Sequence, residues 1–176
     1  MEDRMTEPIT QPTSESRRQL LDMRDNMISN PHYADDPEYT AWLEAAGTFE
    51  PSTISEIVDG LYITARDGVN EAVIEGHFII NVTQQGELKT YYDAQVSIYP
   101  NDRTNIVRLD ALVTLISGLI DSGHHVTVHC SMGMERSVLV VAYYLHKCHG
   151  MTLDEAYATI IDRRPIAVDR REWARL

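Results

Sequence analysis

The sequence predicts a single α/β domain, in which a central, mostly parallel, twisted sheet is flanked by helices and extra helices precede it at the N-terminus. Two observations predict this class. From about residue 54 onward, short apolar runs alternate with helix-like segments, which is typical of strands alternating with helices. The length of 176 residues suits one domain with an appendage. We therefore expect one layered domain.

The charge of the chain is uneven. Residues 1–60 contain thirteen acidic and four basic residues, whereas residues 61–176 contain fourteen and eleven. A nucleic-acid partner would require a basic face, so none is expected. No signal peptide is apparent, and no apolar run approaches the ~18 residues of a membrane span. Two cysteines, Cys130 and Cys148, are too few for a disulfide scaffold, which favours a reducing, cytoplasmic location and leaves a nuclear one open.

The chain divides into three predicted regions. Residues 1–15 are polar and predict a flexible acidic lead. Residues 16–53 predict a helical extension, and residues 54–176 carry the alternating pattern of the expected catalytic domain. We expect the extension to pack on that domain, with a docking or dimerisation element as the alternative.

The elements follow from local signals. In the extension, one helix is expected over 16–29. Asp36 can cap a second helix, Pro37 suits its first turn and Gly47 its end. The remaining expected elements are a strand pair over 57–63, a short helix over 67–75, strands over 77–82 and 94–99, a helix over 104–122, a strand over 125–129, a buried helix over 137–149, and a helix that a capping box opens at Thr152 and Glu155.

Residues 129–137, with the sequence His-Cys-Ser-Met-Gly-Met-Glu-Arg-Ser, connect the last expected strand to the buried helix. The free backbone N–H groups and the dipole at a helix N-terminus favour anion binding. The same environment should lower the pKa of Cys130 below its usual ~8.5 and make it a nucleophilic thiolate. Arg136 can donate two parallel hydrogen bonds to a phosphoryl group.

The other residues of this loop have supporting roles. Gly133 allows a tight turn, Ser137 can hydrogen-bond the sulfur as a leaving group, and His129 is expected to orient the loop by hydrogen bonds. A cysteine six positions before an arginine is common by chance, but its place between a strand and a buried helix favours catalysis. The expected phosphate-binding residues are Ser131, Met132, Gly133, Met134, Glu135 and Arg136.

The motif His-Cys-x-x-Gly-x-x-Arg-Ser is the signature of cysteine-dependent phosphatases, and residues 54–176 resemble the small dual-specificity protein tyrosine phosphatases. The segments 59–63, 79–82 and 164–176 extend the resemblance. It implies a tyrosine-phosphatase-like fold that hydrolyses phosphotyrosine and phosphoserine or phosphothreonine in protein substrates through a phosphocysteine intermediate. It implies no metal and no cofactor.

The family takes its general acid from an aspartate on a loop that follows a strand and precedes the helix before the cysteine. Residues 98–106 occupy this place, and the resemblance implies that Asp102 protonates the leaving oxygen and later activates water. The alternative is that Asp102 merely caps the helix that follows. Both can hold, because capping can use a neighbouring group.

Two positions leave alternatives open. Glu135 is an acid where the family more often carries a small or neutral residue. We expect it to point outward, and the alternatives are a second acid or a lipid-headgroup selector, as in myotubularin-type phosphatases. Arg164 belongs to a C-terminal basic cluster and is a candidate secondary anion site, against simple solvent exposure.

Other functions are compatible with some of the same residues. Glu135 and the arginine cluster keep a phosphoinositide phosphatase open as an alternative, while the acidic charge disfavours an RNA 5′-phosphatase. A phosphate-binding pseudoenzyme and a rhodanese-like sulfurtransferase are disfavoured because Cys130, Arg136, Asp102 and Ser137 are all present. Cys148 is expected to be an ordinary buried thiol.

Overall fold

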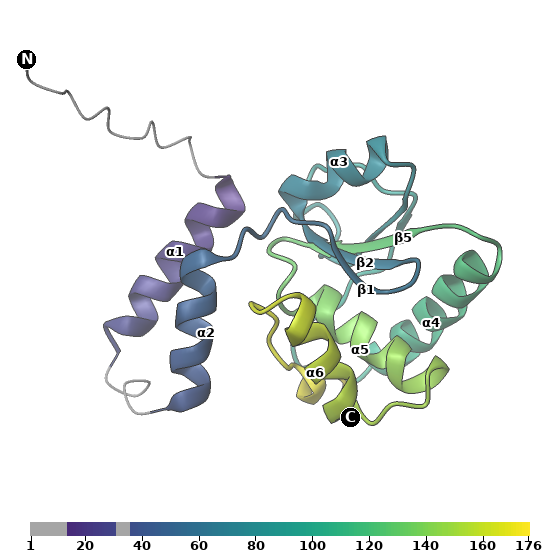
Figure 1. The fold of residues 1–176 in the computed structure, drawn as a ribbon. Helices are drawn as coiled ribbons and strands as arrows, with labels where there is room; N and C mark the ends of the chain where they lie inside the picture. Colours follow the sequence, from purple (N-terminus) through teal and green to yellow (C-terminus); the bar gives the residue numbers. More distant parts are fainter. Residues whose placement is uncertain (1–13, 31–35) are drawn as a thin grey trace, which may run out of the picture.

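The computed structural model describes residues 14–30 and 36–176. A five-stranded sheet with the order β1-β2-β5-β3-β4 forms its middle layer. Helix α3 covers one face of the sheet and helices α4, α5 and α6 cover the other (Figure 1). β1 and β2 are antiparallel, and the other neighbouring strands are parallel. This arrangement confirms the predicted α/β class. The strands are β1 (Ser55–Val58), β2 (Leu61–Ala65), β3 (Phe78–Asn81), β4 (Ala94–Gln95) and β5 (Val126–Cys130).

The central strand β5 is buried along its whole length. It pairs in parallel with β2 on one side, where Ala65 faces Cys130, and with β3 on the other, where Asn81 faces His129. Parallel strands end at the same edge of a sheet, and ligands of open α/β sheets bind at that carboxyl edge. The fold therefore places Cys130 at the edge where a site is expected.

Helix α5 follows this strand and is buried from Ser137 to Leu145. It packs against both α4 and α6. The capping box forms as predicted, because Thr152 accepts the Glu155 backbone N–H at 3.2 Å and Glu155 accepts that of Thr152 at 2.8 Å. The helical segments are η2 (Arg66–Gly68), α3 (Val69–Ile74), α4 (Asn105–Asp121), α5 (Arg136–Cys148), α6 (Leu153–Arg163) and η3 (Arg171–Ala174).

Two local expectations differ from the structure. The strand expected over 94–99 is reduced to the two residues of β4. Beyond them the chain still runs beside β3, where Val96 and Ile98 donate single backbone bonds to Asn81 and Val82, but no ladder continues. Cys148, expected to be buried, is exposed because it lies at the end of α5, past the buried stretch.

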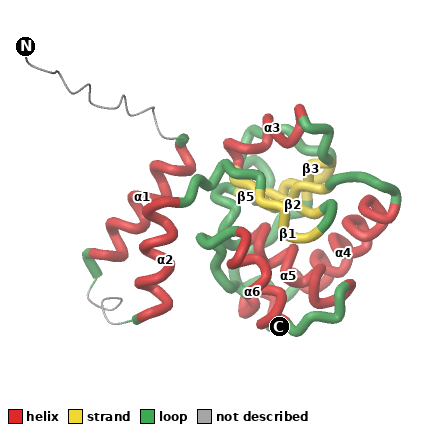
Figure 2. The backbone as a smooth tube through the Cα atoms, in the orientation of Figure 1, coloured by secondary structure: helices red, strands yellow, loops and turns green. Residues whose placement is uncertain are grey.

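The N-terminal hairpin consists of α1 (Glu15–Ile28) and α2 (Pro37–Thr48), which lie side by side next to the α/β layers (Figure 2). Asp36 caps α2 as predicted, but the helix continues through Gly47. Its last carbonyl groups are satisfied from α1, since Arg17 donates to the carbonyl oxygens of Ala46 and Phe49 at 2.6 and 2.7 Å. The expected acidic lead lies outside the described residues, except for its last two positions. None of the described helices is long and apolar enough to cross a membrane.

Candidate active site

The nucleophile candidate Cys130 is 4% exposed, and its sulfur lies 3.4 Å from the hydroxyl oxygen of Ser137. Burial alone would raise the pKa of the thiol. The hydrogen bonds from the Ser137 hydroxyl and backbone, the charge of Arg136 and the Gly133 N–H outweigh this effect and hold the Cys130 pKa below its ordinary value. The structure thus brings Cys130, Arg136 and Ser137 together as expected.

Gly133 gives the loop its tight turn. Its φ is +65°, a conformation that favours glycine, and a Cβ atom there would lie 2.7 Å from the carbonyl oxygen of Thr64. Both the backbone conformation and the close approach of β2 therefore require glycine at this position.

Arg164 is not a surface anion site, because its side chain is fully buried. Its guanidinium donates to the loop carbonyl of Gly133 at 2.6 Å and to that of Met132 at 3.3 Å. Other N–H groups bond the Pro51 carbonyl at 2.7 Å and the Ser55 hydroxyl at 3.1 Å. Burial lowers the Arg164 pKa to about 10, which leaves it charged at neutral pH. The expectation fails because carbonyl groups of several segments converge on this side chain. Arg164 thus acts as a clamp, meaning that its hydrogen bonds fix the loop carbonyls from the interior of the protein.

Glu87 is a site residue that sequence reasoning missed. Its carboxylate accepts hydrogen bonds from the Ser131 hydroxyl at 2.6 Å and from the Arg136 guanidinium at 2.7 Å. Burial would raise the pKa of Glu87, but these bonds outweigh it and lower that pKa. A carboxylate therefore already engages two groups expected to hold phosphate. The contact spans 49 residues of sequence, and no local pattern around Glu87 signals it.

Asp102 is held outside the cavity beside Cys130. One of its carboxylate oxygens accepts from the backbone N–H and hydroxyl of Thr104, at 2.8 and 2.7 Å, and the other accepts from Arg108 at 2.9 Å. The bond from Arg108, followed by those from Thr104, lowers the Asp102 pKa to about 2. The carboxylate is therefore ionised and paired, and it does not border the cavity. The capping alternative is not met, because the N-cap of α4 is Thr104 and no side chain caps that helix.

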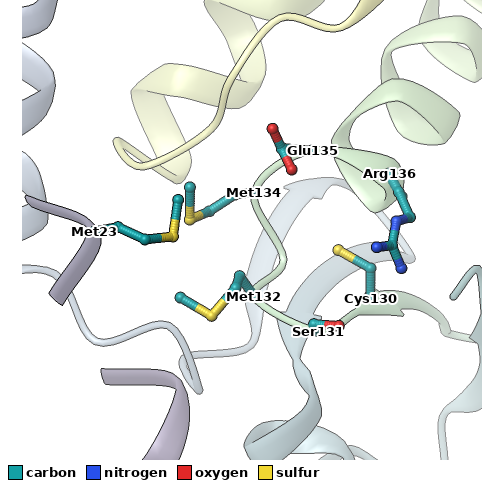
Figure 3. Close-up of a pocket in the computed structure, with 7 residues that line it drawn as sticks. All are labelled: Met23, Cys130, Ser131, Met132, Met134, Glu135 and Arg136. Atoms are coloured by element: carbon teal, nitrogen blue, oxygen red, sulfur yellow. The ribbon is translucent and has the colours of Figure 1, made fainter. Parts of the chain in front are cut away.

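Glu135 lies at the rim of the cavity that Cys130 borders (Figure 3). Its carboxylate pairs with Arg170, which donates from Nε and from Nη2 at 2.7 Å each. The guanidinium of Arg170 also lies over the Trp173 ring, 5.4 Å from its centroid. The expected outward position is met only in part, because Glu135 borders the cavity but its carboxylate is taken up by Arg170. This pairing explains how the loop tolerates an acid next to Arg136.

His129 is buried in the core, and burial lowers its pKa to about 4, so the imidazole is neutral at physiological pH. Neither ring nitrogen has a well-formed hydrogen-bond partner among residues 14–30 and 36–176. The expectation that its ring orients the loop by hydrogen bonds is therefore not met. Its backbone carbonyl, by contrast, accepts from Val82 at 3.0 Å and helps to fix the end of β5.

A small cavity opens beside the sulfur (Figure 3). Cys130 and Arg136 bound one side of it, and three methionine side chains gather on the other. One of these, Met23, belongs to the N-terminal hairpin and was not among the expected site residues. The lining residues are Met23, Cys130, Ser131, Met132, Met134, Glu135 and Arg136. In the part of the chain that the structure describes, no group of three or more His, Cys, Asp or Glu residues is placed to hold a metal ion.

Comparison with known proteins agrees with this geometry. The family described as "Dual specificity phosphatase, catalytic domain" matches residues 62–176. "Dual specificity protein phosphatase 1" of Arabidopsis thaliana is 28% identical over 134 residues, covering 71% of this chain and 68% of its own. The crystal structure of human DUSP28 superposes with a TM-score of 0.59 at 18% identity, covering 68% of this chain and 86% of that chain. The structure of PTPMT1 in complex with PI(5)P gives 0.57 at 20% identity, covering 68% and 88%. The family match spans well over half of the sequence, and the chain therefore belongs to the dual specificity phosphatase family, an enzyme family of phosphatases.

Proposed function

We propose that this protein hydrolyses phosphate monoesters of protein side chains through a phosphocysteine intermediate. The observation that carries the proposal is the Cys130 thiol, which lies 3.4 Å from the Ser137 hydroxyl, has a lowered pKa and borders the same cavity as Arg136. A thiolate beside a guanidinium and the N-terminus of a helix can attack phosphorus while the phosphoryl oxygens are held.

The reaction proceeds in two steps. In the first, the sulfur of Cys130 forms a bond to phosphorus, the ester P–O bond breaks, and Asp102 gives its proton to the leaving oxygen. In the second, Asp102 takes a proton from water, the water oxygen bonds to phosphorus, and the P–S bond breaks to release phosphate and the thiolate. Arg136 stabilises the charge on the phosphoryl oxygens in both steps.

Asp102 has to leave its partners to take part. In the described conformation it is paired with Arg108 and Thr104, and its pKa of about 2 keeps it ionised. The contacts lie at the surface, where solvent screening makes ion pairs weak. We propose that substrate binding draws this loop towards the cavity, where Asp102 acquires its proton.

The charge around the cavity supports a singly phosphorylated protein side chain over a phosphoinositide. Arg136 is paired with Glu87 and Arg170 with Glu135, so each arginine is matched by a carboxylate. A headgroup with several phosphates would need unpaired cations. The complex of PTPMT1 with PI(5)P keeps a lipid substrate as the competing hypothesis.

The test is hydrolysis of p-nitrophenyl phosphate and of phosphotyrosyl and phosphothreonyl peptides by the wild-type and Cys130→Ser proteins, with PI(5)P vesicles in parallel. We expect turnover to fall roughly 10⁴-fold or more in the variant, because the nucleophile is lost. Acid quenching of the wild-type protein during turnover of ³²P-labelled substrate should leave label on Cys130. Activity that survives in Cys130→Ser would refute the mechanism, and faster hydrolysis of PI(5)P than of both peptides would refute the protein substrate.

A further inference from the structure

We infer that Met23, Met132 and Met134 form a binding surface, the methionine shelf, that receives the aromatic ring of phosphotyrosine. The inference rests on the proposed function and narrows it. It assigns to the N-terminal hairpin, which precedes the residues that match the family, the role of biasing the enzyme towards aryl phosphates.

The N-terminal hairpin is firmly attached beside the loop. The backbone N–H of Ser16 donates to the Asp67 carboxylate at 2.8 Å, and Glu15 forms a 2.8 Å ion pair with Arg66. On the second helix, the Trp42 indole donates to the Ile166 carbonyl at 3.1 Å. These contacts connect both helices to the catalytic domain, so a side chain of α1 can hold a constant place at the cavity.

An apolar cluster fills the junction between the hairpin and the loop. Leu20 and Ala46 of the hairpin are fully buried against Met134 and Ile166, and Met132 packs at the edge of the same cluster. Burying a leucine, isoleucine or methionine side chain is worth about 1.5–3 kcal/mol. This junction accounts for the two methionines of the loop, because they face a neighbour that precedes the residues matching the family.

Met23 extends this cluster into the cavity. Its side chain remains 40% exposed, while Met134 is 3% exposed, so the shelf is anchored on one side and accessible on the other. Figure 3 shows the three methionines together across the cavity from Cys130 and Arg136. If a phosphate is held at Cys130, the organic group esterified to it would therefore lie along this apolar side or point out to solvent.

The chemistry of the shelf favours an aromatic ring. Thioether sulfur makes favourable contacts with aromatic rings, each worth about as much as a weak hydrogen bond. In phosphotyrosine the ring is bonded directly to the phosphate oxygen and can reach the shelf. Phosphothreonine places a short aliphatic carbon and then polar backbone there. An inositol ring would place hydroxyl groups against three thioethers, where their hydrogen bonds with water are lost.

The experiment compares one peptide sequence carrying phosphotyrosine or phosphothreonine at the same position. Met23→Gln keeps the length and helix propensity of the side chain but replaces the thioether with an amide. We expect the ratio of kcat/KM for phosphotyrosine to that for phosphothreonine to fall about 2- to 10-fold. Ile28→Gln is the matched control, since Ile28 lies on the same helix, is 61% exposed and does not border the cavity. Thermal unfolding of both variants checks that the hairpin remains folded.

An equal loss on both peptides would mean that Met23 only supports the loop, and an unchanged ratio would mean that the ring does not lie on the shelf. Either result overturns the inference and leaves the proposed reaction standing. A different result would refute the proposed reaction itself, namely hydrolysis of the phosphotyrosyl peptide by the Cys130→Ser protein.

Discussion

Two loops of the same domain are held by different kinds of contact. We call residues 131–135 the phosphate loop and residues 99–104, which precede α4, the Asp102 loop. The phosphate loop is held from beneath by Arg164, which is fully buried and donates to the Gly133 and Met132 carbonyls. The Asp102 loop is held from outside, by contacts to Thr104 and Arg108 in which both members of the ion pair keep about a third of their side chains exposed, 30% and 31%.

The difference has an energetic meaning. Removing the partner of a buried carbonyl costs about 1–3 kcal/mol, whereas an exposed ion pair contributes little because solvent screens it. We infer that the half of the site proposed to bind phosphate is prepared before substrate arrives, and that the half that holds the proposed proton donor is free to change its partners. Loops that move in catalysis come from such weakly held regions.

The largest effect is expected for Asp102→Asn, which tests whether the Asp102 loop supplies the proton donor. This substitution keeps the shape of the side chain but removes its ability to donate and accept a proton. We expect kcat on an alkyl phosphate to fall roughly 10²- to 10⁴-fold. The loss on p-nitrophenyl phosphate should be smaller, because nitrophenolate leaves without full protonation. Initial rates on the two substrates give the measurement, and Asp110→Asn, in which Tyr143 can still donate to the new amide oxygen, is the control.

Equal losses on both substrates would contradict a proton donor at residue 102. The pairing itself can be followed by NMR titration of the Asp102 carboxyl carbon. The midpoint should lie at about 2 in the wild-type protein and rise towards the usual ~3.9 in Arg108→Ala, because losing the cation disfavours the carboxylate. The Asp102 contacts thus contribute stability above about pH 4, and this contribution is lost as the pH falls through 2.

The prepared half of the site is tested by Arg164→Met, which keeps the bulk and removes the donors. We expect kcat/KM to fall about 10- to 100-fold and the free energy of unfolding to fall by roughly 3 kcal/mol, because several buried carbonyl groups lose their donors. Peptide hydrolysis and urea unfolding give the two values. Arg163→Met is a matched control, since the side chain of Arg163 is 61% exposed and should change neither value appreciably.

Arg164→Lys separates positioning from stability. A lysine restores the charge and some of the bonds, so it should recover stability more fully than kcat, which depends on the position of the loop carbonyls. If Arg164→Met binds and turns over substrate like the wild-type protein, the loop does not need its clamp and the comparison fails.

The smallest expected effect is that of Glu87→Gln. Its carboxylate accepts hydrogen bonds from Arg136 and Ser131. Removing its charge should therefore lower the Kd for inorganic phosphate about 2- to 5-fold, which is the scale of an exposed ion pair. Calorimetric titration in a Cys130→Ser background would measure it, with Glu71→Gln on α3 as the control. Because the Glu87 pKa is lowered, the carboxylate is ionised at pH 5.5–8, and the difference should persist across that range. Weaker phosphate binding would mean that Glu87 positions Arg136 rather than competing for it.

What the sequence predicts well is what lies close together along the chain. The strand, loop and helix around Cys130 are contiguous, so the proximity of Arg136 and Ser137 follows from local structure alone. The order of strands and helices also follows from local patterns, with an error at β4, where the pairing of β3 with the next segment decides how far a ladder continues.

The remaining features depend on contacts that distant segments make only after folding. Glu87 meets Arg136 across 49 residues, and Arg164 reaches Pro51 across 113. Met23 reaches the cavity from a helix that precedes the family domain. An arginine near a helix end looks the same in sequence whether it is solvated or buried, and for this reason the expectation for Arg164 is wrong.

The position of Arg164 also has a consequence for the order in which the protein is made. The carbonyl groups that it joins belong to residues synthesised well before it, including Pro51, Met132 and Gly133. While the ribosome still holds the C-terminal part of the chain, Cys130 is present but its loop has no clamp. A nascent or truncated chain that stops before residue 164 would carry Cys130 without the bonds that hold its loop, so we expect activity only in chains that include Arg164.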